Sequence, residues 1–311
     1  MARLIAYRLL NAAISIALVS IAIFLLFEFS PETVAAEALG QYSTPEQRLL
    51  WLEAHGYLQP LPVRFLDWVL RCLRGEFGAS RVFAAPVSAV LWPRLGASAL
   101  LAACFFLVLI PLSLTLGVLA GMREGGLADR LISLASILTT SIPPFASAVL
   151  LSALFVFSLG WLPGTSAMLD GFSWRELVLP VAVLVLYDFG YLARITRASM
   201  ADVMRTPYIR TAALKGMPTG RIILRHALRN ALIPPFTVIM LQVNWLIGGV
   251  IVVEFFFAYK GFGSLILEAS LGQDLFLLQA CTAVSVLIAV ATQTLADIGY
   301  GVLNPRIRIA R

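Results

Sequence analysis

The sequence predicts an all-α membrane protein with six transmembrane helices. Hydrophobic residues make up 60% of the 311 positions and charged residues only 13%, whereas an average soluble domain is roughly 25% charged. Six apolar runs are close to or longer than the roughly 20 residues that a helix needs to cross the hydrocarbon core. They are Leu9–Phe27, Ala97–Ala120, Leu131–Phe157, Leu177–Ala193, Asn230–Val253 and Leu277–Val302. The runs are continuous and do not alternate, which favours a helical bundle over a membrane barrel.

The first run follows two arginines, Arg3 and Arg8, which is also typical of the charged start of a signal peptide. Its apolar core is too long for a typical signal sequence, and Ala36-Glu37-Ala38, which resembles a cleavage site, comes well after the core ends. We therefore expect residues 1–28 to form a retained first transmembrane helix.

A polar insertion, residues 29–95, separates the first two runs and is too small for us to expect an independent domain. The letters TPEQ, beginning at Thr44, predict a helix start with an N-cap, a proline at the first helical position and a capping box. Gly56 should end this helix, and a second short helix fits Val63–Leu73. Both helices are amphipathic, so they should pack on the bundle or lie at the membrane interface. Residues 96–311 should form the core with five transmembrane helices.

Proline pairs interrupt two of the runs. Pro143-Pro144 lies in the middle of the third run and Pro234-Pro235 lies near the start of the fifth. Proline removes a backbone hydrogen bond and clashes with the preceding turn, so we expect kinked or broken helices there. Such breaks indicate either a solute pathway or moving part, or an ordinary packing kink.

Basic residues are unevenly distributed between the two sides that six spans define. Six spans place both termini and two loops on one side of the membrane. This side holds 15 of the 23 Lys and Arg, in the N-terminal tip, residues 121–130, residues 194–229 and the C-terminal tail. Most acids fall on the other side. This pattern predicts cytoplasmic termini. It also explains the net charge of +6 without a nucleic-acid partner.

The sequence offers no catalytic or metal-binding constellation. A phosphate-binding loop, a Ser/His/Asp arrangement and a zinc-binding His-Glu-x-x-His are all missing from it. The two histidines and three cysteines lack metal-ligand spacing; they are His55, His226, Cys72, Cys104 and Cys281. We therefore expect no enzyme, no cofactor and no metal.

Polar residues within the spans are candidates for a translocation path. Asp188 is the most interior acid, and a charge at the bilayer centre costs on the order of 3 kcal/mol. It either contacts a substrate or proton, or pairs with Arg194 or a backbone group. Interface anchoring or structural pairing fits Glu254 and Asp297 better, near their span ends, but Glu254 stays a candidate. The amides Gln242 and Asn244 could line the path or join neighbouring helices.

The segment from Thr206 to Arg229 predicts two short helices joined by a sharp turn. Thr206-Pro207 starts the first helix, and Gly216 stands where a left-handed C-terminal cap belongs. A second helix follows Pro218, and three of its arginines recur every four residues, which places them on one face; they are Arg221, Arg225 and Arg229. Such a rigid, small-tipped surface suggests a protein partner.

The stretch RTAALKG, followed by RHALRNALIP, resembles the coupling loop, or EAA loop, of permease subunits in bacterial ABC importers. Arg210, Thr211 and Ala212 stand where that motif has Glu-Ala-Ala, ahead of Gly216, and Arg-Thr-Ala is usual in the peptide branch. GEFGAS, SIPPF, GWLPG, VVEFFFAYKGFGSLI and the tail DIGYGVLNPRIR resemble other blocks of the B-type dipeptide/oligopeptide/nickel permease family. The resemblance covers nearly the whole chain.

The resemblance implies a binding-protein-dependent ABC permease, that is, a type I importer bundle with a cytoplasmic coupling helix. Its ATPase-coupling residues would be Arg210, Thr211, Ala212, Ala213, Lys215, Gly216, Met217 and Arg221. The chain would lie in the bacterial inner membrane and move a small solute, with di- and oligopeptides as the family default, into the cytoplasm by alternating access.

The implied partners are a second, C-type permease subunit, two ATP-binding-cassette ATPases that hydrolyse the ATP, and an extracytoplasmic solute-binding protein. The alternative is a self-contained proton- or ion-coupled secondary transporter that uses Asp188 and Asp297. That alternative predicts inverted repeats, which we do not find in the sequence.

Overall fold

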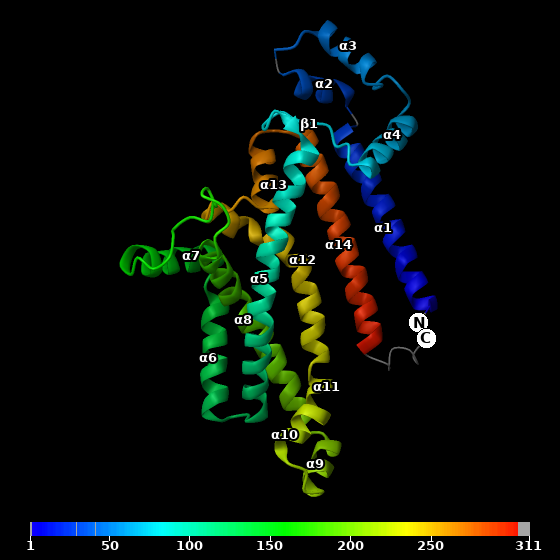
Figure 1. The fold of residues 1–311 in the computed structure, drawn as a ribbon. Coiled ribbons are helices and arrows are strands. Elements are labelled where there is room, and N and C mark those ends of the chain that lie inside the picture. Colours follow the sequence, from blue (N-terminus) through cyan, green and yellow to red (C-terminus); the bar gives the residue numbers. More distant parts are fainter. Residues whose placement is uncertain (1, 29, 41, 304–311) are drawn as a thin grey trace. The chain divides into compact units, whose positions relative to one another are not determined.

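The computed structural model describes residues 2–28, 30–40 and 42–303, with the backbone alone described at residues 2–5, 37, 244–249 and 300–303. Figure 1 shows the helices in chain order. The chain divides into two compact units, which we describe separately. The first unit comprises Met1–Ser98 and Lys260–Thr294, and the second comprises Ala99–Tyr259 and Leu295–Arg311. The predicted basic tail after residue 303 lies outside the described residues.

Four helices in the described part are long and apolar enough to cross a membrane. They are α1 (Ala2–Glu28), α5 (Val87–Met122), α8 (Trp174–Met204) and α14 (Leu275–Leu303). A bent helix pair raises the number to five if it forms one span. The predicted fifth run coincides with α12 (Ile233–Phe256), of which Ile233–Val243 is classed only as a shorter apolar helix. The fold class is confirmed, and six spans stay a prediction.

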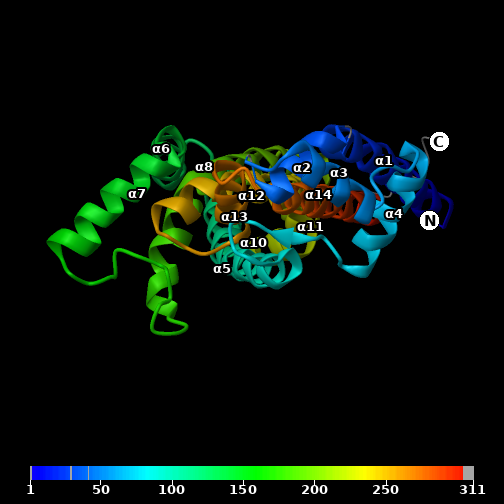
Figure 2. The ribbon, with the colours of Figure 1, turned by 90° about the horizontal axis from the view of Figure 1, so that it is seen from above.

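The proline pair in the third run breaks the helix, as predicted. α6 (Leu127–Ser141) and α7 (Pro144–Ser152) meet at a bend of 101°, and a π-helical turn, η1 (Ala153–Ser158), continues α7. Ile142 and Pro143 are extended, with ψ of 120° and 149°, because each precedes a proline ring that disfavours the helical region. Figure 2 shows α7 leading away from α6.

The second proline pair starts a helix and does not kink one. Pro234 and Pro235 lie in the first turn of α12, where the missing N–H groups have no helical partner in any case. The helix that precedes the break is α11 (Leu228–Ala231), and Leu232 separates the two.

α8 is the central helix of the second unit and packs on α6, α7 and α12. It is also approached closely by α5. A methyl group on Gly117 would lie 2.5 Å from the Thr196 side chain, and one on Gly121 would lie 2.5 Å from the Arg197 carbonyl oxygen. Small residues four positions apart allow two membrane helices to pack at short distance.

The first unit combines the polar insertion with residues that come late in the sequence. The insertion holds α2 (Pro31–Leu39), α3 (Pro45–Ala54), α4 (Leu61–Arg74) and a short antiparallel pair, β1 (Ala79–Ser80) and β2 (Ala85–Pro86). The late residues form α13 (Phe262–Leu271) and the start of α14. The predicted capping box is present, since Gln47 N donates to Thr44 Oγ1 at 3.3 Å and Thr44 N donates to Gln47 Oε1 at 3.0 Å.

Asp274 joins the strand pair to α14. Its carboxylate accepts hydrogen bonds from Ser80 Oγ at 2.5 Å and from Val82 N at 3.0 Å. The other oxygen accepts from Leu277 N at 3.1 Å, which satisfies a donor in the first turn of α14 that has no helical partner. A single buried carboxylate thus fixes the residues that follow α4 against the start of a membrane-spanning helix.

Candidate functional site

The predicted pair of short helices is present in the second unit. The first is α9 (Pro207–Leu214), and the second is a continuous run of α10 (Thr219–Ile222), the π-helical turn η2 (Ile223–Ala227) and α11. We call residues 207–231 the helix–turn–helix segment. The wide turn η2 interrupts the regular spacing of four between Arg221, Arg225 and Arg229, although all three side chains are exposed.

The turn between the two helices has a defined hydrogen-bond pattern. Met217 N donates to Ala212 O at 3.3 Å and Gly216 N donates to Ala213 O at 2.9 Å, which is the Schellman motif. Gly216 has a φ of +74°, a conformation that glycine adopts without a steric penalty. The predicted left-handed cap is therefore confirmed at this residue.

One face of the segment is buried within the protein. Ile209, Ala212, Ile222, Ile223, Ala227 and Ala231 form a cluster with Met200 of α8, and Met217 packs against it. Ala212 is only 8% exposed. Although we predicted Ala212 as a coupling residue at the tip, its side chain points into this cluster.

The other predicted coupling residues are mostly on the surface. Arg210, Thr211, Ala213, Lys215, Gly216 and Arg221 are exposed, and Met217 is half-buried. Two leucines that sequence reasoning did not select are also highly exposed, Leu214 at 81% and Leu224 at 73%. Their apolar side chains in an otherwise basic segment were the signal that could have identified them.

An acidic residue that we did not predict braces the base of this segment. Asp129 is buried; it pairs with Arg197 Nε, accepts from Arg197 Nη2 at 2.7 Å and accepts from Gly125 N at 2.8 Å. Nearby, Arg205 Nη2 lies 2.5 Å from Glu124 Oε2. The loop before α6 is thus fixed to the end of α8 that leads into α9.

Two of the predicted path residues meet in the interior of the second unit. Gln242 Nε2 donates to Asp188 Oδ1 at 2.8 Å, and Asp188 is 4% exposed. Its other oxygen, Oδ2, has no hydrogen-bond partner in the described part of the chain. The alternative pairing with Arg194 is absent among the described residues, because Asp188 Oδ1 accepts from Gln242 and Oδ2 has no partner, while Arg194 Nε donates to the Gly190 carbonyl oxygen.

The two remaining candidates for the translocation path are Glu254 and Asn244. Glu254 is fully buried near the end of α12, and its carbonyl oxygen accepts from Tyr259 N at 2.8 Å. Burial and the nearby Glu254 charge raise the pKa of Tyr259 to about 12, so the phenol stays protonated at neutral pH. The side chain of Asn244 lies outside the described residues.

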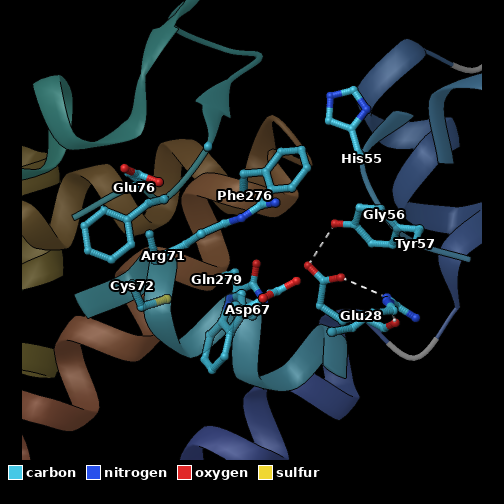
Figure 3. Close-up of a pocket in the computed structure, with 15 residues that line it drawn as sticks. Glu28, His55, Gly56, Tyr57, Asp67, Arg71, Cys72, Glu76, Phe276 and Gln279 are labelled. Atoms are coloured by element: carbon cyan, nitrogen blue, oxygen red, sulfur yellow. Dashed lines mark hydrogen bonds and ion pairs between the residues drawn. The ribbon is translucent and has the colours of Figure 1, made fainter. Parts of the chain in front are cut away.

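The first unit contains a pocket of about 100 Å³ that sequence reasoning did not predict (Figure 3). The end of α1, the residues between α3 and α4, α4 itself, the turn after α4 and the start of α14 line it. Residues that are far apart in the sequence are brought together here, so neither a local motif nor a periodic pattern indicated the pocket.

Comparison with known proteins defines the class to which this architecture belongs. Residues 113–309 match the family of binding-protein-dependent transport system inner membrane components. Residues 1–105 match the N-terminal domain of binding-protein-dependent transport system membrane components. The chain belongs to this family. It is a multi-pass inner membrane protein and the permease subunit of an ABC importer, in which a separate subunit is the ATPase.

Individual relatives align with the chain along almost its whole length. It is 34% identical over 305 residues to a probable peptide ABC transporter permease of Sinorhizobium fredii, covering 97% of both chains. It is 31% identical to an oligopeptide transport system permease of Bacillus subtilis, covering 93% of this chain and 94% of the other. It is 32% identical to a glutathione transport system permease of Salmonella typhimurium, covering 97% of both.

Proposed function

We propose that this permease imports short peptides or peptide-like solutes. The observation that supports the substrate class is the naming of the aligned relatives, whose solutes are peptides, oligopeptides and glutathione. All three classes carry amide bonds and charged groups. We further propose that a solute-binding protein delivers the solute, that a second permease subunit completes the pathway, and that two ATPase subunits drive alternating access.

We propose that the helix–turn–helix segment is the contact for an ATPase subunit. Support comes from its two faces. The inner face is fixed on a buried apolar cluster, and the outer face presents Leu214 among Arg210, Thr211, Ala213 and Lys215. An exposed apolar side chain with a rim of polar groups is a common arrangement at protein interfaces. On this proposal residues 194–229 and both termini are cytoplasmic.

We propose that Asp188 and Gln242, with Glu254 and Asn244 as further candidates, belong to the translocation path. The buried Asp188 Oδ2 without a partner supports this role, because an unsatisfied acid in a membrane span is costly and usually has a function.

The test is uptake by the purified complex in proteoliposomes. We expect labelled trialanine to accumulate only with external solute-binding protein and internal ATP. A nonhydrolysable ATP analogue should abolish uptake, and a proton ionophore should leave it unchanged. Accumulation that follows a proton gradient without ATP would contradict the coupling scheme, and uptake of a solute without an amide bond in place of trialanine would contradict the substrate class.

A further inference from the structure

The pocket of the first unit has one fixed wall. Arg64 Nη2 donates to Glu28 Oε2 at 3.1 Å and to the Glu28 carbonyl oxygen at 2.7 Å, and Tyr57 OH donates to Glu28 Oε1 at 3.2 Å. The Arg64 guanidinium lies over the Tyr57 ring, 4.6 Å from its centroid. The polar groups of Glu28, Tyr57 and Arg64 bind one another, so this wall has a structural role. A ligand in the pocket would therefore bind to other residues of the lining.

Another part of the lining carries a polar group that has no partner within the described residues. Gln279, on α14, is 4% exposed, and its Nε2 atom is out of contact with water and has no hydrogen bond among the described residues. A buried amide without a partner costs about 1–3 kcal/mol. Figure 3 shows Gln279 beside Asp67 in the pocket, with Arg71 nearby. Buried polar groups in proteins are satisfied by a protein group, an ordered water or a ligand, so this amide is available to a ligand that enters the pocket.

Charged groups of both signs flank this amide. Asp67, Arg71 and Glu76 line the pocket, and within the described residues none of their side chains forms a hydrogen bond or an ion pair. Aromatic rings complete the lining, among them Phe276 and Tyr57. A carboxamide both donates and accepts, as a peptide bond does. Arg71 matches a carboxylate, which is the charged group at the carboxyl-terminal end of a peptide.

We propose that this pocket is a binding site for the carboxyl-terminal end of a peptide, with Arg71 on the carboxylate and Gln279 on the terminal peptide bond. The proposal rests on the proposed function, since it places the imported solute at a defined site on the permease. The volume of about 100 Å³ is smaller than an engineered cavity of roughly 150 Å³ that takes one benzene. Only a terminal residue fits inside, and the rest of an oligopeptide remains outside. The site therefore accepts peptides of different length.

Cys72 provides a probe of occupancy, because it also lines the pocket. Burial, and to a lesser extent the Glu28 charge, raise the pKa of the Cys72 thiol to about 11. Only the thiolate reacts with maleimides, so alkylation should be slow at pH 8 and quicken about tenfold per pH unit up to pH 10. The experiment uses the full-length permease in nanodiscs with Cys104→Ala and Cys281→Ala, which leave Cys72 as the only cysteine.

Trialanine is the probe. At about ten times its Kd it should slow alkylation of Cys72 about tenfold, because only empty pockets react. N-acetyl-trialanine-amide, which lacks both charged ends, should protect weakly. Glycerophosphoethanolamine has both charges without a peptide bond and represents a lipid headgroup. Protection by this compound and not by trialanine would assign the pocket to lipid and overturn the proposal.

Two variants test the named contacts. Gln279→Leu should raise the Kd for trialanine about tenfold, through loss of the hydrogen bonds to the peptide bond. It should not lower the thermal unfolding midpoint, because Gln279 Nε2 has no hydrogen-bond partner among the residues that the structure describes. Arg71→Gln should weaken binding similarly, whereas Arg74→Gln, on the same helix but outside the pocket, should leave the Kd unchanged. If Gln279→Leu destabilises the protein and leaves protection intact, the amide is structural and the proposal fails.

The outcome is separable from that of the uptake test. ATP-driven trialanine uptake without protection of Cys72 overturns the pocket and leaves the proposed function standing. Protection without uptake supports the pocket and contradicts the function. If the solute-binding protein slowed Cys72 alkylation whether empty or loaded, and trialanine did not, the pocket would be part of a docking surface for that protein. This result would also overturn the proposal.

Discussion

At the scale of single residues, Glu28 ends the first transmembrane helix inside the protein and not in water. Both Glu28 and its partner Arg64 are buried, and the Arg64 guanidinium also stacks near Phe24, 5.7 Å from the ring centroid. Truncating one member of such a pair leaves a buried charge without compensation, which costs about 3–5 kcal/mol. The position of α4 against the end of α1 therefore depends on this carboxylate.

We expect Glu28→Gln to lower the free energy of unfolding of the full-length protein by about 3 kcal/mol, because Arg64 stays buried without an anionic partner. Thermal unfolding in detergent measures the change. Glu268→Gln is the matched control, since Glu268 pairs with Arg94 at the same distance of 3.1 Å but is 42% exposed, and exposed pairs contribute about 0–1 kcal/mol. Equal shifts for both variants would mean that the burial of the Glu28 pair has no energetic consequence.

The second prediction at this scale concerns the proposed role of Asp188 in uptake. Asp188→Asn should lower ATP-driven peptide uptake roughly tenfold, the effect of losing a charged hydrogen bond of about 1.5 kcal/mol. Expression and thermal stability should persist, since the neutral amide is less costly to bury than a carboxylate. Asp202→Asn, exposed on the same helix, should leave uptake unchanged. Unaltered uptake kinetics in Asp188→Asn would reduce the pair with Gln242 to a structural contact.

At the scale of elements, the geometry of α9 depends on how it ends. Gly216 has a φ of +74°, and no atom lies within 4 Å of a methyl group placed on it. A β-branched residue there is strained by its own backbone and not by neighbours, at a cost of about 1–3 kcal/mol. The strain would act on the turn between α9 and α10, which sets the direction of the exposed Leu214.

We expect Gly216→Val to reduce uptake and to abolish the stimulation of ATP hydrolysis by loaded solute-binding protein, because the turn presents α9 to the ATPase. Membrane insertion should be normal. Gly220→Val is the control, since Gly220 is also exposed and has open space around it but no positive φ. Full stimulation in Gly216→Val would show that the segment does not transmit the signal.

Local sequence signals predicted several of the element boundaries. The capping box at Thr44, the left-handed end at Gly216 and the break at Pro143-Pro144 each depend on residues within a few positions, so the sequence determines them directly. The sequence did not predict the helix α2 or the π-helical turn η2. It also did not predict polar contacts between residues far apart in the chain, such as Asp129 with Arg197, 68 positions apart, because neither partner indicates the other in the sequence.

At the scale of the whole molecule, composition and apolar runs predicted the fold class, and the motif around Gly216 predicted the family, which comparison confirms. The pocket could not be predicted, since its lining joins Glu28 near one end of the sequence to Gln279 near the other. The burial of Ala212 was likewise hidden, because it follows from packing between α9, α10 and α8 and not from the motif itself. The spans and the signature are local properties, whereas the site depends on tertiary contacts.

The orientation of the chain in the membrane is the last prediction. If the chain crosses the membrane six times, the loops on the same side as both termini hold most of the basic residues, and loops rich in Lys and Arg stay in the cytoplasm. Glu46 is exposed at the start of α3, and Thr219 is exposed at the start of α10, so a cysteine at either position is open to reagents.

In intact spheroplasts of a cysteine-free background, we expect an impermeant maleimide to label Glu46→Cys and to spare Thr219→Cys. Permeabilisation should then expose Thr219→Cys, which controls for its reactivity. The reverse pattern would invert the topology and place the helix–turn–helix segment on the side of the membrane without ATPases, so the proposed coupling would fail with it.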